Sequence, residues 1–223
     1  MTVAFFAQTE SQSNGHRPFR SRFEACMKLP TGEIDFPVTR VDPLFEDQPI
    51  VGVTHTSPGH WLADCIARLG QAARQFDVGV RPLHVPMPLA ILQSADTPDQ
   101  CLNAVKSQDC CPQEFILEFQ DSTLAQTEDG VLDRMEAFRR KGFRIGLDAR
   151  RSSESPFGAR LRSAVERMRV TEFDLMNDDN VQMRAEIVSG LGGDVILDRA
   201  SWKNVDLLKS FGATHAQKLI ADA

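Results

Sequence analysis

The sequence lacks any long run of apolar residues, and this absence is the first constraint on what the protein can be. No stretch approaches the roughly 18 apolar residues that a membrane-spanning helix requires. The N-terminal segment has a short apolar start, but it has neither a basic region nor a long apolar core, so it does not resemble a signal peptide. We expect residues 1–20 to form a flexible tail and residues 21–223 to form a single domain.

Positive charge is also in short supply. The chain has 25 Lys and Arg against 31 Asp and Glu, which gives a net charge of −6. Binding to nucleic acid needs clustered basic residues that neutralise phosphates, so this balance argues against a nucleic-acid partner.

Cysteine spacing of the metal-binding or disulfide type is missing as well. The five cysteines are an odd number and include the adjacent pair Cys110 and Cys111 but no CxxC motif. This usage fits a reducing compartment, so we expect a cytoplasmic location. His55 and His60 have no cysteine or acid at ligand spacing, and we interpret them as loop residues.

The chain does contain a regular alternation of helical and extended patterns from about Trp61 onward. Apolar spacing and capping residues predict helices and buried strands in turn. The predicted helices lie near residues 62–76, 97–108, 128–141, 158–169, 183–187 and 201–212, and the predicted strands near 80–85, 114–119, 143–148, 171–176 and 194–198. Strands buried on both faces and separated by helices indicate parallel βαβ units, either in a (β/α) barrel or in an open sheet.

Acidic residues recur at the ends of these strands. They are Glu118, Asp121, Asp148, Asp174, Asp178 and Asp198. In a parallel barrel the carboxyl ends of the strands share one face, where carboxylates could converge on a cation or a proton-transfer site. The alternative is that these acids cap the helices that follow.

Five blocks in order resemble the EAL-domain family, which hydrolyses cyclic di-GMP. They are "EFILEFQDS", "RRKGFRIGLDARR", "RVTEFDLMNDD", "DVILDRASW" and "LLKSFGATHAQ". The corresponding family blocks read approximately LELEITES, G-x-x-IALDDFG, D-x-LKID, VIAEGVE and LG-x-x-x-AQGY. The earlier stretches "CMKLPTGEIDFPVTR" and "LHVPMPLAIL" are similar to the first hairpin and to the VNLS strand. The resemblance implies a TIM-like barrel with an antiparallel first strand and two divalent cations at its mouth.

The sequence departs from the family pattern at several of these places. The signature glutamate falls at Phe36, although the arginine of that motif is matched by Arg40. The VNLS asparagine falls at Pro86, and the second aspartate of DDFG at Ala149, followed by Arg150 and Arg151. In the later blocks, the family lysine falls at Asp174 and its aspartate at Met176, the second glutamate of AEGVE falls near Ser201, and the AQGY block keeps Gln217 but has Lys218 for glycine.

Three carboxylates, Glu118, Asp148 and Asp198, remain as family remnants. A magnesium or calcium ion takes about six oxygen ligands, so these are too few for two cations. The sequence therefore predicts a degenerate EAL-like domain that is not an enzyme, needs no metal and acts through an unidentified protein partner or as a homodimer. The first βα connection, after Arg40, is shorter than is usual in the family.

Two other functions remain open at this point. The first is a non-catalytic cyclic di-GMP receptor that uses Arg40, Glu118 and Asp148. The second is a weak phosphodiesterase that uses Mg²⁺ or Mn²⁺ with Glu118, Asp148, Asp198 and Asp174.

Overall fold

The computed structural model describes residues 20–42, 58–75, 82–87, 95–126 and 130–221. The strands are β1 (Arg20–Lys28), β2 (Ile34–Asp42), β3 (Leu83–Met87), β4 (Phe115–Gln120), β5 (Arg144–Asp148), β6 (Arg167–Val170), β7 (Asp194–Leu197), β8 (Ala200–Ser201), β9 (His215–Ala216) and β10 (Leu219–Ile220). The helices are α1 (Pro58–Gln75), α3 (Thr97–Ser107), α4 (Asp121–Gln126), α5 (Gly130–Arg140), α6 (Ala159–Ala164), α7 (Glu172–Asn177), α8 (Asp179–Gly190) and α9 (Val205–Ser210), with 3₁₀ turns at Pro112–Glu114 and Trp202–Asn204.

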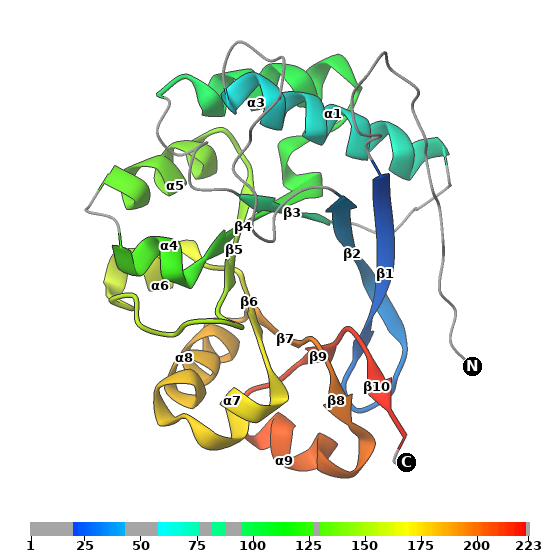
Figure 1. Cartoon of the computed structure of the whole chain (residues 1–223), viewed down its shortest axis with the longest axis vertical. Helices are drawn as coiled ribbons and strands as arrows, with labels where there is room; N and C mark the ends of the chain where they lie inside the picture. Colours follow the sequence, from blue (N-terminus) through cyan, green and yellow to red (C-terminus); the bar gives the residue numbers. More distant parts are fainter. Residues whose placement is uncertain (1–19, 43–57, 76–81, 88–94, 127–129, 222–223) are drawn as a thin grey trace.

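The strands curl around a common axis, and the helices lie outside them (Figure 1). Within the described residues, an eight-stranded sheet has the order β2-β1-β9-β7-β6-β5-β4-β3. The two end strands, β2 and β3, contact each other. Strand β1 runs antiparallel to both of its neighbours, whereas β3, β4, β5, β6, β7 and β9 pair in parallel. The predicted barrel with an antiparallel first strand is therefore confirmed.

Amphipathic helices pack against the outside of the barrel. In α5, Val131, Met135 and Phe138 share one face and are buried, and the Phe138 ring meets Phe143 edge-on at 5.7 Å between centroids. The helix gives way to a turn at Gly142, whose φ of +92° is a conformation that side chains with a Cβ rarely adopt. The helix predicted over residues 128–141 is thus present and begins at Gly130.

Two predicted elements around β6 are wrong. Residues 171–176 were predicted as a strand, but Thr171 accepts a hydrogen bond from the backbone of Asp174 and starts helix α7. The helix predicted over residues 158–169 ends at Ala164, and β6 follows it. Local capping chemistry and a short alternating run decided both cases, because each element is only four to six residues long.

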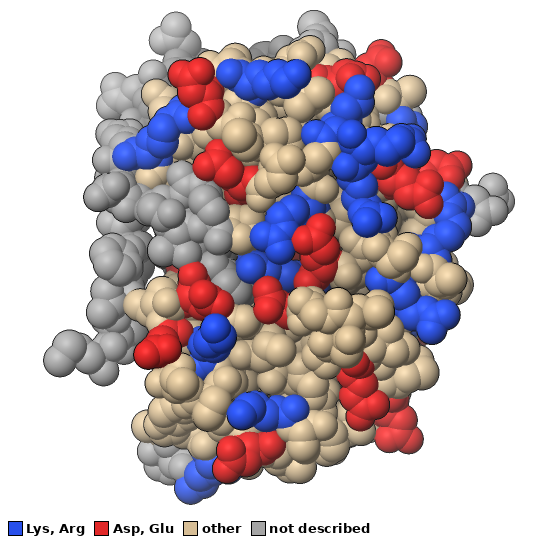
Figure 2. Space-filling model, turned by 180° about the vertical axis from the view of Figure 1, so that it is seen from behind, with Lys and Arg blue, Asp and Glu red and all other residues tan. Residues whose placement is uncertain are grey.

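Charges of both signs are interspersed over the face shown in Figure 2, where Lys and Arg lie beside Asp and Glu. No helix in the described ranges is long and apolar enough to cross a bilayer. The predicted tail, the first βα connection and His55 fall mainly or wholly outside the described residues, as do the side chains of Phe36, Arg40 and His60.

Candidate functional site

Glu118 lies at the centre of the site, on β4. Leu117 and Phe119 on either side of it belong to the apolar core, so strand alternation turns Glu118 the other way, into the barrel. Its register partner on β5 is Gly146, where a Cβ would come within 2.9 Å of the Ile116 side chain. The glycine therefore lets β5 pass close beside the strand that carries the buried carboxylate.

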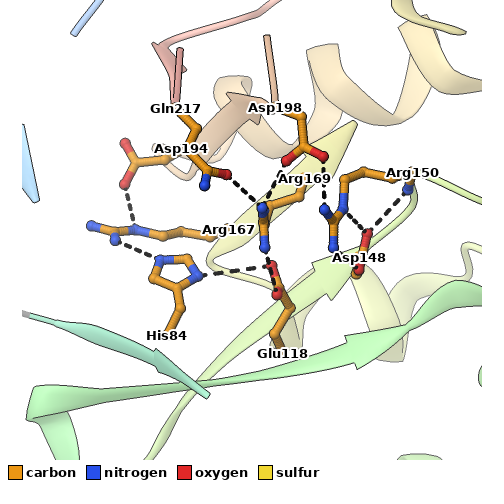
Figure 3. A network of polar contacts seen from close by, with 9 residues as sticks. All are labelled: His84, Glu118, Asp148, Arg150, Arg167, Arg169, Asp194, Asp198 and Gln217. Carbon is orange, nitrogen blue, oxygen red and sulfur yellow. Dashed lines mark hydrogen bonds and ion pairs between the residues drawn. The ribbon is translucent and has the colours of Figure 1, made fainter. Parts of the chain in front are cut away.

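Arg169 on β6 extends its guanidinium across the barrel towards three side chains (Figure 3). It donates to Glu118 Oε2 at 3.0 Å and to Asp198 Oδ1 at 2.7 Å. A third bond, at 2.7 Å, goes to the side-chain oxygen of Gln217. Arg169 and Glu118 are both 4% exposed, so this pair is removed from water and its charge-assisted bonds are strong.

Arg150 lies on the solvent side of the same network. Its Nε and Nη2 donate to the two oxygens of Asp148 at 2.8 and 2.6 Å, and its Nη1 donates to Asp198 at 2.7 Å. Asp198 thus receives Arg150 on one oxygen and Arg169 on the other. The predicted remnants Glu118, Asp148 and Asp198 are brought together, with the two guanidinium groups between them.

A second polar layer lies beside the first and includes His84 on β3. Arg167 on β6 donates to Asp194 at 2.7 Å, and its Nη1 lies 3.0 Å from His84 Nε2. Because a guanidinium only donates, Nε2 must accept and the proton of His84 must sit on Nδ1. Nδ1 lies 3.8 Å from a carboxylate oxygen of Glu118. His84 therefore connects the two layers as a neutral imidazole (Figure 3).

The electrostatic environment keeps the mouth groups charged and His84 neutral. Burial alone would raise the pKa of Glu118, but the positive charge of Arg169, with help from His84, lowers it to about 2. Burial is likewise outweighed at Asp198, where Arg169 and Arg150 lower the pKa. For His84 burial dominates and lowers the pKa, despite the nearby Glu118 carboxylate. These shifts follow the ordinary rules for desolvation and for opposite charges.

The residues present do not fit a pair of divalent cations. The oxygens of Glu118, Asp148 and Asp198 that face the mouth accept hydrogen bonds from Arg169 or Arg150. Within the described ranges no group of three or more His, Cys, Asp or Glu could hold a metal ion. The guanidinium groups occupy the space between the carboxylates in which a cation would need its ligands.

The other acids that were predicted at strand ends contribute to local structure. Asp174 and Thr171 exchange hydrogen bonds at the start of α7, and Asp178 accepts from two backbone N–H groups at the start of α8. Asp121 is fully buried and bonds to Arg184. The helix-capping alternative therefore applies to Asp178, the N-cap of α8, whereas Asp174 lies inside α7 and bonds to its N-cap Thr171. Convergence applies to the three mouth acids.

The sequence patterns did not predict Arg169 as a residue of the site. The resemblance matches the family lysine to Asp174 and its aspartate to Met176, but both of these residues lie on helix α7. The strand that enters the barrel is β6, and Arg169 is its basic residue nearest Glu118. The alternation Arg167-Met168-Arg169-Val170, with charged and apolar residues in turn, is the signal that could have identified it.

Four further positions that match the family blocks are Gln217, Ala149, Arg151 and Ser201. Gln217, directly after β9, accepts a hydrogen bond from Arg169 and donates one to Glu24 of β1. It therefore links the last strand of the barrel to the first. Arg151 is exposed, whereas Ala149 is buried. Ser201 donates its backbone N–H to Glu172 at 2.8 Å.

Comparison with solved structures places the fold. The chain is similar to the PaMucR phosphodiesterase in complex with c-di-GMP, with 16% identity and a TM-score of 0.69 over 90% of this chain and 93% of that one. It is similar to the EAL domain of Mycobacterium smegmatis DcpA, with 15% identity and a TM-score of 0.67 over 89% of both chains. The Klebsiella pneumoniae BlrP1 calcium/cy-diGMP complex matches at 14% identity and a TM-score of 0.69, over 94% of this chain and 56% of that one.

These likenesses show that the chain has the fold of an EAL domain. No protein-family model matches the sequence, and no curated protein matches it.

The prediction that the chain is not an enzyme is contradicted by these comparisons. A structure that it resembles over 90% of its length is named a phosphodiesterase. The departures at Ala149, Pro86 and Phe36 therefore do not establish a loss of activity. That the domain is degenerate stays a prediction.

Proposed function

We propose that the chain is an EAL-fold signalling domain that binds cyclic di-GMP at the barrel mouth. The proposal is supported by two similar folds, PaMucR and BlrP1, whose structures are complexes with this nucleotide. The observation that carries it in this chain is the position of Arg150, which is partly exposed and still has hydrogen-bond donors to offer.

The remaining donors follow from valence. A guanidinium has five N–H groups, and Arg150 uses three of them on Asp148 and Asp198. Two N–H groups are left on a side chain that is 23% exposed. Planar guanidinium donors match the oxygens of a phosphodiester, and cyclic di-GMP presents two such groups. Arg150 is therefore the residue best suited to meet a phosphate.

Charge near the mouth supports an anionic ligand. Arg151 and Arg199 are exposed and follow the mouth residues directly in sequence. With Arg150 and Arg169 they place four arginines among the mouth residues or directly after them in sequence. Attraction of a dianion to these arginines depends on salt.

We propose that binding needs no divalent cation, because the guanidinium groups already supply positive charge among the carboxylates. The predicted contact between the nucleotide and Arg40 stays a prediction, as do the unidentified protein partner and the homodimer.

The experiment that tests this function is calorimetric titration of the purified protein with cyclic di-GMP, in EDTA and in Mg²⁺ or Mn²⁺. Each mixture is also assayed for the linear dinucleotide. We expect saturable binding with the same dissociation constant in EDTA and in metal. No heat of binding under any of these conditions would overturn the proposal, and binding only with metal would overturn its metal-independent form. The product assay reports separately whether bound nucleotide is turned over.

A further inference from the structure

The connection between β5 and α6, residues 149–158, is anchored by two charged residues from other elements. Asp121, the first residue of α4, is completely buried. It accepts hydrogen bonds from the Ser152 hydroxyl at 2.9 Å and from the Ser155 backbone N–H at 3.1 Å, and also from the Ser155 hydroxyl. One carboxylate therefore holds two residues of the connection.

Arg184 on α8 holds the same connection from the other side. It is 2% exposed and donates to Asp121 at 2.7 Å. Its Nη2 donates to the backbone oxygens of Ser153 and Ser155, and its guanidinium carbon lies 5.2 Å from the centre of the Phe157 ring. Arg184 thus contacts the connection at three residues as well as Asp121.

Further bonds fix the middle of the connection to the start of α8. The Ser153 hydroxyl donates to Asp178 at 3.3 Å, and the Asn180 side chain donates to the Ser153 carbonyl at 2.6 Å. Arg150 lies only two residues before Ser152, a span of about 7.6 Å at most because consecutive Cα atoms are about 3.8 Å apart. A displacement of the anchored residues therefore also displaces Arg150.

A buried ion pair is weak evidence for stability, because desolvation of the two charges offsets their attraction, and an apolar pair of similar volume is often as stable. What such a pair does supply is one defined geometry for the groups bonded to it. In this chain those groups are the backbone of the connection that starts at the barrel mouth.

We propose that Arg184 is a positioning residue for the barrel mouth. Through Asp121 and residues 152–157, it fixes the place from which Arg150 extends to Asp148 and Asp198. Arg184 bonds to Asp121, Ser153 and Ser155 and not, among the described residues, to the mouth side chains. Its effect on the affinity for the nucleotide is therefore indirect. This inference about affinity rests on the proposed function, whereas the inference about the position of Arg150 does not.

The test uses the double variant Asp121→Asn with Arg184→Met, which removes both buried charges and leaves no unpaired ion. The single variant Arg184→Met is measured beside it. The matched control is Val188→Ala, which removes buried apolar contact from the same helix. All are measured in the full chain for three quantities: amide hydrogen exchange, the Arg150 Nε–H signal in a ¹H–¹⁵N spectrum, and the dissociation constant for cyclic di-GMP.

In the double variant we expect faster exchange confined to residues 150–157, a broadened or lost Arg150 Nε–H signal, and a dissociation constant raised about three- to tenfold. The control should leave the Arg150 signal and the dissociation constant unchanged. An unchanged Arg150 signal in the double variant, or an equal change in the control, would overturn the inference. If the wild type binds no nucleotide, the proposed function fails, and the exchange and Arg150 measurements still decide the positioning role.

Discussion

At the scale of single residues, the barrel mouth is organised by charge compensation. Glu118 is buried, and a buried carboxylate keeps its charge only when cations and donors compensate for lost water. Arg169 provides that compensation at 3.0 Å, and the pKa of Glu118 falls to about 2. Asp198 has a lowered pKa for the same reason, with Arg169 and Arg150 on its two oxygens.

The burial of His84 predicts that the free energy of unfolding depends on pH. Burial lowers its pKa in the folded state, and the lone pair of Nε2 faces a donor from Arg167. A lowered pKa means that the unfolded chain takes up a proton first, at a pKa of about 6.5. The stability that neutral His84 contributes is therefore complete above about pH 6.5 and is lost as pH falls below it. Ionised Glu118 and Asp198 also contribute stability, which is complete above about pH 5 and is lost as pH falls further towards their lowered pKa values.

The measurement is the free energy of unfolding in urea at pH 7 and pH 5, for wild type and His84→Gln. We expect wild type to lose more stability than the variant over this range, by up to about 2 kcal/mol if His84 stays neutral in the folded chain. Val85→Ala, a buried change on the same strand, is the control and should retain the wild-type difference. A variant that keeps the full difference would show that another group titrates there.

At this scale the sequence predicted part of the site. Glu118, Asp148 and Asp198 could be identified because each lies within, at the end of or directly after an apolar strand that also resembles a family block. Arg169 could not be placed while residues 158–169 were read as a helix. The orientation of Arg150 depends on two acids, one of them 48 residues away along the chain, and no local pattern reports such a contact.

At the scale of elements, β6 is the unusual component. It delivers two arginines into the barrel interior, while Met168 and Val170 face the apolar core. Barrel interiors are ordinarily filled with branched apolar side chains. These buried charges on β6 are compensated by three carboxylates: Glu118 on β4, Asp194 on β7 and Asp198 directly after β7.

This arrangement predicts a strong coupling between β4 and β6. Replacing Arg169 with Met leaves Glu118 buried without its main partner, and we expect a loss of about 3–5 kcal/mol in the free energy of unfolding. In the double variant Glu118→Leu with Arg169→Met, the unpaired charge is gone and most of that loss should be recovered. Urea unfolding of wild type, both single variants and the double variant measures the coupling. Additive losses would contradict it.

The elements themselves were predictable to different degrees. Helices α3, α5 and α8 carry apolar residues at helical spacing, and strands β4, β5 and β7 are continuous apolar runs, so these were found. Helix α7 was missed because its first four residues alternate between acidic and apolar side chains, and the capping bond that Thr171 accepts was decisive. Short elements depend on such single bonds more than on periodicity.

At the scale of the whole molecule, alternating strands and helices predicted the barrel class. The antiparallel first strand followed from the resemblance to the EAL family and is confirmed by the pairing of β1 with β2 and β9. Pattern alone did not separate a barrel from an open sheet, because both bury parallel strands between helices. That distinction depends on the contact between β2 and β3, strands that are far apart along the chain.

We propose that the guanidinium groups at the mouth of this EAL fold bind cyclic di-GMP. The most direct measurement compares the dissociation constants of wild type, Arg150→Gln and Arg160→Gln at one salt concentration. Arg160 is a fitting control because it also binds two carboxylates, Glu136 and Asp133, but lies on α6. We predict a rise of about ten- to a hundredfold for Arg150→Gln and no change for Arg160→Gln. Equal dissociation constants for all three proteins would contradict the account.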